Sequence, residues 1–127
     1  MTDTVDKREF LRIDHGALLN LKVLKGEKLR MKENTVGRNI SACGLLFRIN
    51  GEDSIPALSS VVWVELDAKM LNICLEIEKD LIVHNGGIFG RVVRIAEGDP
   101  GQTYDIGVCF LRRKNMKEED VQALIRA

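Results

Sequence analysis

Two arginines near the start of the chain are of a type and spacing that could bind a ligand. Arg8 and Arg12 are four residues apart, a separation that puts both on one side of the chain whether it is helical or extended. Each guanidinium can donate two parallel hydrogen bonds to a phosphate or to the O6 and N7 acceptors of guanine. Taken alone, residues 6–9 would equally be a solvated charge run whose members pair with one another at little energetic gain.

A second group of polar residues follows in the pattern Asn39-x-Ser41-x-x-Gly44. Asn39 and Ser41 are two apart, so in extended backbone they face the same way, and Gly44 has no Cβ to hold a flat ring away from the backbone. A planar ligand could therefore bind there. The alternative is a turn in which both side chains merely bond to nearby backbone.

The two groups together resemble the double signature of the PilZ domain family, R-x-x-x-R followed by [D/N]-x-S-x-x-G. Each half occurs often by chance, whereas both in this order and spacing do not. The resemblance continues with Phe10, with strands at 90–94 and 104–110, and with a closing helix, and it covers nearly the whole chain from Lys7.

The resemblance implies an all-β fold, a six-stranded antiparallel PilZ-type β-barrel with a C-terminal α-helix. Residues 1–12 would form a flexible arginine segment that folds over the barrel to trap cyclic di-GMP. Arg8 and Arg12 would contact its phosphates and guanine edges, and Asn39 and Ser41 would hold the other edge or a phosphate. Ordering of the segment would pass the second-messenger signal to an unidentified downstream protein.

Three neighbouring positions qualify this expectation. Asn39 is the less frequent family choice, and its amide offers one neutral oxygen where a carboxylate would accept both guanine donors with charge assistance, so weaker binding is expected. In this family the residue before the first arginine bears on whether one or two ligand molecules are held, and Lys7 is compatible with either. Arg38 points away from Asn39 if the strand is regular, and a β-bulge would reverse that.

Other chemistry finds little support in the sequence. The chain shows no nucleophile and base pair, carboxylate dyad, metal-ligand spacing or phosphate-cradling glycine loop, so we expect neither an enzyme nor a cofactor or metal site. His15 and His84 are isolated beside glycines and are assigned no role. The three cysteines, Cys43, Cys74 and Cys109, lack CxxC spacing and are expected to be small buried thiols.

Charge and aromatic content argue against general nucleic-acid binding. Lys plus Arg and Asp plus Glu both number 19, and aromatic residues are 5% of the chain, so a single-stranded nucleic-acid binder of the OB type is disfavoured. The competing function is a PilZ-fold protein-interaction adaptor with weak or no nucleotide binding. A monomer or a homodimer fits either function.

The elements that would position these side chains are mostly strands. Residues 103–110 alternate, with Tyr104, Ile106, Val108 and Phe110 on one face. Alternation also predicts a strand at 70–78, where Leu71, Ile73, Leu75 and Ile77 share a side. Further β-rich runs, bounded by turn-forming residues that favour antiparallel neighbours, are 17–25, 44–49, 60–66 and 88–96.

A helix is predicted only at 115–126. Asn115 would cap it, Glu118 stands at the capping-box position, and Val121, Leu124 and Ile125 form one stripe. Closing the strands into a barrel would remove their unpaired edges. The 127 residues, 45% of them apolar, are enough for a single domain, residues 1–127. With no membrane-span-length apolar run and no export signal visible, a cytoplasmic location is expected.

Overall fold

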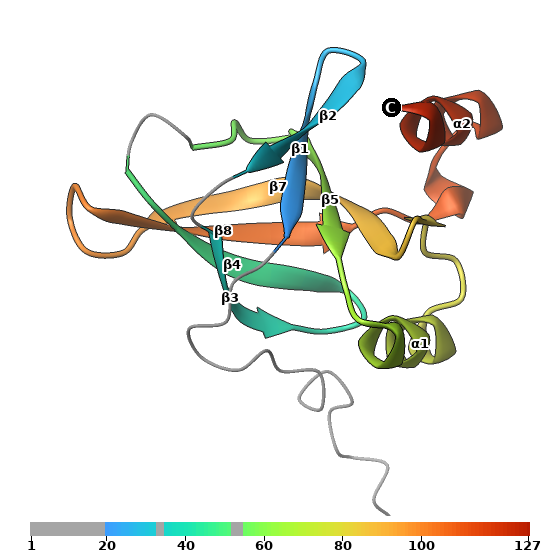
Figure 1. Ribbon diagram of the computed structural model, residues 1–127, viewed down its shortest axis with the longest axis horizontal. Coiled ribbons are helices and arrows are strands. Elements are labelled where there is room, and N and C mark those ends of the chain that lie inside the picture. Colours follow the sequence, from blue (N-terminus) through green and yellow to red (C-terminus); the bar gives the residue numbers. More distant parts are fainter. Residues whose placement is uncertain (1–19, 33–34, 52–54) are drawn as a thin grey trace, which may run out of the picture.

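An antiparallel sheet of eight strands makes up most of the structure, a computed structural model that describes residues 20–32, 35–51 and 55–127 (Figure 1). Two α-helices and one short 3-10 helix complete the described part of the chain. The elements are β1 (Leu21–Lys25), β2 (Lys28–Lys32), β3 (Thr35–Ile40), β4 (Gly44–Asn50), β5 (Val61–Glu65), α1 (Ala68–Ile77), β6 (Val83–His84), β7 (Gly87–Glu97), β8 (Thr103–Phe110), η3 (Arg113–Asn115) and α2 (Glu118–Arg126).

The sheet is not closed into a barrel. Its strands follow the order β2-β1-β5-β7-β8-β4-β3, with the short β6 attached to β7, and the end strands β2 and β3 do not pair within the described residues. In Figure 1, β1 and β5 run across the direction of β4 and β8, so the sheet is strongly twisted. The predicted antiparallel β fold with a C-terminal helix is confirmed, whereas the prediction of six strands closed into a barrel differs from this open sheet of eight.

The main core lies on one face of the sheet, because apolar residues alternate along its strands. Phe47 and Ile49 on β4 and Ile106 on β8 have no exposed surface, while the residues between them are half-buried. A second cluster lies under α2 and contains Trp63, Ile82, Phe89, Val121 and Leu124. The two clusters use the two faces of β5, which explains why Val62, Trp63 and Val64 are all buried.

The strands that the sequence predicted each carry two or more buried apolar residues. The runs at 103–110, 44–49, 60–66 and 88–96 correspond to β8, β4, β5 and β7, and β1 corresponds to the described part of 17–25. The strands not predicted, β2, β3 and β6, carry few buried side chains or are very short. Glycine turns join several pairs, and the residues at the tip of the β6–β7 hairpin, Asn85 and Gly86, both have positive φ, 51° and 81°.

The prediction of a strand at 70–78 is wrong, since Ala68–Ile77 forms α1. Asp67 caps this helix by accepting a hydrogen bond from the backbone N–H of Met70 at 2.8 Å. The apolar residues also fit a helical stripe, because Met70, Ile73, Cys74 and Ile77 follow the spacing i, i+3, i+4, i+7. Helix α1 packs against the main core through Cys74, which is fully buried.

The C-terminal helix is confirmed, but its predicted cap is wrong. Asn115 belongs to the 3-10 helix, and α2 begins at Glu118 after Lys117, whose side chain does not cap it. Val121 and Leu124 are buried against the second cluster, as the predicted stripe requires. Among the described helices, none has the length and apolarity of a membrane span.

Candidate functional site

The three described residues of the predicted site lie in and beside one hairpin. Asn39 is on β3, Ser41 follows the end of that strand, and Gly44 begins β4. Ile40 points into the core, so its neighbours Asn39 and Ser41 lie on the outer face of the sheet, where Asn39 is exposed and Ser41 half-buried. The other predicted ligand residues, Lys7, Arg8 and Arg12, lie outside the described residues.

A β-bulge places Arg38 beside Asn39. The β3–β4 register passes from Gly37 opposite Phe47 directly to Asn39 opposite Leu46, which leaves Arg38 as the extra residue. Two adjacent residues of a bulge oppose one partner, so Arg38 and Asn39 both lie on the outer face. The expectation for a regular strand, that Arg38 points away from Asn39, is therefore wrong, and the bulge alternative is confirmed.

The Ser41 side chain already has a structural partner. Its hydroxyl oxygen accepts a hydrogen bond from the backbone N–H of Cys43 at 3.1 Å, and its own N–H donates to the carbonyl of Gly44 at 2.8 Å. This is the local turn that the sequence offered as an alternative to a binding site. A hydroxyl that accepts one hydrogen bond still has its proton to donate, so Ser41 can hold the turn and also donate to an anion.

Gly44 is required by the pairing of β4 with β8. A Cβ added to it would overlap the backbone carbonyl of Val108, a group fixed by the sheet. The sequence explained this glycine by the approach of a flat ligand, whereas the close approach here is made by a neighbouring strand. The absence of a side chain still leaves the outer face flat at this point.

An ion pair lies on the same outer face, four residues after Gly44 along β4. Arg48 on β4 donates to Asp105 on β8 through Nε at 2.7 Å and through a terminal nitrogen at 3.1 Å. The hydrogen bond from Arg48 lowers the pKa of Asp105, and the positive charges of Arg38 and Arg94 lower it further. Three arginines thus surround one carboxylate, which leaves local positive charge on this face.

The strand register aligns these residues into three rows across β3, β4, β8 and β7. The middle row has a cation and an amide at one end, a leucine and a glycine in the centre, and a valine and a cation at the other end. Its members are Arg38 and Asn39, then Leu46, then Gly107, then Val93 and Arg94, which a second register shift, in β7, places together. The flanking rows contain Ser41, Gly44, Cys109 and Arg91 on one side and Val36, Arg48, Asp105 and Ala96 on the other.

This arrangement could accept a flat, anionic molecule. Gly107 adds no side chain to the centre of the middle row, and a Cβ there would lie 3.3 Å from Cβ of Arg94. A planar ring laid over Leu46 and Gly107 would have a guanidinium group at either end and the Asn39 amide beside it. The sequence pattern was not used to assign Arg48 or Arg94 to the site. Arg48 lies between the buried residues Phe47 and Ile49, and this alternation could have identified it. Arg94 is two residues after the buried Val92 and reaches the outer face only through the register shift in β7, so alternation would have placed it on the core face.

The outer face continues into a hollow at Cys109. A cavity of about 280 Å³ there is lined by Arg91, Cys109, Arg112 and five neighbouring residues. The prediction that all three cysteines are buried is wrong, because Cys43 and Cys109 are exposed and only Cys74 is buried. Burial raises the pKa of the Cys74 thiol to about 11.

Comparison with known proteins identifies no relative. No family model matches the chain, and neither a curated protein nor a solved structure is significantly similar to it.

Proposed function

We propose that this chain is a cyclic di-GMP receptor of the PilZ type, whose ligand lies on the outer face of β3, β4, β8 and β7. The observation that carries the proposal is that Asn39 and Ser41 share this face with Arg38, Arg48 and Arg94. Arg8 and Arg12 would complete the site from the N-terminal segment.

The charge of this face supports an anionic ligand. Asp105 neutralises one of the three nearby arginines, so about two positive charges remain, which matches the two phosphodiester charges of cyclic di-GMP. The chain as a whole has a formal charge of zero, so this attraction is local. A small dianion would therefore be favoured over a long polyanion such as duplex DNA.

The polar groups beside these cations support recognition of guanine. The Asn39 side chain is exposed and makes no hydrogen bond with another described residue, so its oxygen and its amide protons are both available. Its oxygen could accept from N1–H or N2–H of guanine, while Ser41 donates to a phosphate. Arginines at the ends of the middle row could meet the O6 and N7 edge or stack on the base.

The alternative function is an adaptor of the same fold that binds protein with weak or no nucleotide binding. The structural roles of Ser41 and Gly44 favour it, because the turn and the strand pairing use both residues without any ligand. The receptor function requires this chain to bind cyclic di-GMP without another protein present, whereas the adaptor function predicts weak binding or none.

Titration calorimetry with cyclic di-GMP tests the proposal. We expect binding that weakens by about 1–3 kcal/mol in Arg8→Ala and in Arg12→Ala, the usual loss for a charge-assisted contact. Arg126→Ala removes one exposed charge from α2 and should bind like the unsubstituted protein. Unchanged affinity in both N-terminal variants would refute the site, and no heat of binding in any of the proteins would favour the adaptor.

A further inference from the structure

The strand β2 forms an edge of the sheet with an unusual concentration of positive charge. It ends the strand order and pairs only with β1 among the described strands. The β1–β2 hairpin, residues 20–32, contains four lysines and one arginine but a single acidic residue, Glu27. Within the described residues, Lys28 and Arg30 on this edge are exposed and make no ion pair.

The two faces of β2 differ in chemistry. Leu29 and Met31 lie opposite Leu24 and Lys22 of β1, on the face that packs toward the second cluster and α2. Lys28 and Arg30 lie on the other face, opposite Lys25 and Val23. Met31 is 59% exposed, so the apolar side of this edge is incompletely covered.

The backbone of β2 can accept another strand. The two-residue turn Gly26–Glu27 closes on the pair Lys25 and Lys28, which is therefore a hydrogen-bonded pair. Hydrogen-bonded and non-hydrogen-bonded pairs alternate, so the N–H and C=O groups of Leu29 and Met31 point away from β1. Such an edge is a template for strand addition.

We infer that β2 is a docking edge for an extended segment of another protein in which acidic and apolar residues alternate. Acidic side chains would lie beside Lys28 and Arg30, and apolar side chains beside Leu29 and Met31. A second copy of β2 would place like charges opposite one another, which disfavours self-pairing. This interaction is independent of nucleotide binding.

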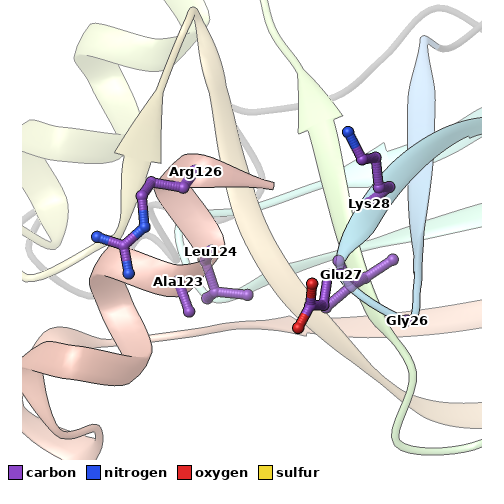
Figure 2. Close-up of a pocket in the computed structure, with 7 residues that line it drawn as sticks. Gly26, Glu27, Lys28, Ala123, Leu124 and Arg126 are labelled. Atoms are coloured by element: carbon purple, nitrogen blue, oxygen red, sulfur yellow. The ribbon is translucent and has the colours of Figure 1, made fainter.

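A cavity at the end of β2 would receive the end of the added segment. It measures about 450 Å³ and lies between the tip of the β1–β2 hairpin and the last turns of α2. Figure 2 shows the Glu27 carboxylate on the hairpin pointing across this space toward Leu124 on the helix, while the side chains of Lys28 and Arg126 extend away from it. Leu24 and Leu124 supply an apolar lining, and Glu27, Lys28 and Arg126 supply charges of both signs, so the cavity suits an apolar residue at the end of the segment.

Fluorescence anisotropy with a short labelled peptide of alternating glutamate and valine tests this inference, with a lysine–valine peptide as the matched control. We expect the acidic peptide alone to bind, and Lys28→Glu combined with Arg30→Glu to weaken it roughly tenfold or more. Lys69→Glu combined with Lys79→Glu changes the net charge equally on exposed positions elsewhere and should leave binding intact. Equal binding of both peptides, or equal loss in both double variants, would overturn the inference.

Two further variants test the strand pairing itself. Met31→Pro removes an outward N–H at an edge position that tolerates proline, and should abolish peptide binding, while Met31→Leu keeps the N–H and should retain it. Bound peptide should slow amide hydrogen exchange at Leu29 and Met31, a measurement that does not depend on any variant folding. Retained binding in folded Met31→Pro, unchanged exchange, or binding to phosphatidylserine vesicles without binding to the peptide would each refute the docking edge.

Discussion

Arg48 and Asp105 are register partners on β4 and β8 and are joined by two hydrogen bonds, of 2.7 and 3.1 Å, on the outer face of the sheet. Their geometry is that of a guanidinium fork on a carboxylate. The pair joins β4 and β8, the two strands that carry the central residues Leu46 and Gly107 of the candidate site. It therefore holds in place the surface on which a ligand would lie.

The pH dependence of stability should show the contribution of this pair. Because the folded state lowers the pKa of Asp105, the stabilisation is present above the pKa of the unfolded chain, about 3.9, and is lost as the pH falls through the lower folded value. Asp105→Asn should therefore lower the melting temperature at neutral pH. It should also make the melting temperature of the variant fall less than that of the unsubstituted protein as the pH is lowered. Glu76→Gln, on the exposed side of α1, serves as the control, and an acid profile that Asp105→Asn leaves unaltered would contradict the assignment.

Gly44→Ala should destabilise the fold by about 1–3 kcal/mol, since the new methyl group would meet a backbone carbonyl and force β4 from β8. Gly107→Ala, which meets only the Cβ of Arg94 at 3.3 Å, should cost less. Urea denaturation of both variants gives the comparison. Equal stability of Gly44→Ala and the unsubstituted protein would mean that packing does not require this glycine.

The helix that the sequence did not predict, α1, has a side-chain cap at its first turn. Asp67→Ala leaves the N–H of Met70 without its acceptor and should lower the free energy of unfolding by about 0.5–2 kcal/mol. Asp67→Ser should recover most of it, because serine also caps well. If Asp67→Ala and Asp67→Ser lower the free energy of unfolding equally in denaturant titrations, loss of the cap is not the cause of the destabilisation.

Asn39→Asp should tighten cyclic di-GMP binding if the amide receives guanine donors. A carboxylate accepts both N1–H and N2–H with charge assistance, whereas the amide oxygen is neutral. Asn39→Ala should weaken binding, and calorimetry measures both. Tighter binding by the alanine variant than by the aspartate variant would exclude contact between this residue and the guanine edge.

Thiol labelling should separate the three cysteines. Cys43 and Cys109 are exposed and should react readily with a maleimide, while Cys74 is buried and its pKa is raised to about 11, so little thiolate forms at neutral pH. Mass spectrometry of labelled native protein should show two modified sites, and three after denaturation. Rapid labelling of Cys74 in the native state would contradict its burial.

The sequence predicted the strands that are rich in buried apolar residues. In β8, buried Ile106, Val108 and Phe110 alternate with Gly107 and Cys109, and this alternation predicts a strand and no helix. In α1, by contrast, Leu71, Ile73, Leu75 and Ile77 alternate as in a strand while the helical stripe is equally present, and only the cap at Asp67 distinguishes the two. Edge strand β2 escaped prediction because three of its five residues are basic.

The site was predictable only in part, because alignment across strands depends on register. Asn39, Ser41 and Gly44 could be found from local spacing. Arg94 reaches the same row only through the pairings of β7 with β8 and of β8 with β4, and no local pattern specifies those. Closure of the sheet likewise depends on contacts between distant strands, so apolar alternation alone could not decide it.

The extra residue in β3 gives this hairpin a tolerance to a change of length. If Arg38 were deleted, Gly37 and Asn39 would become consecutive residues of a regular strand, so Gly37 would still face the core opposite Phe47 and Asn39 would still face outward opposite Leu46. Such a deletion would remove one guanidinium group from the outer face and leave the exposed amide in place. The strand can therefore lose one residue at this point without exchanging the inside and outside of the sheet.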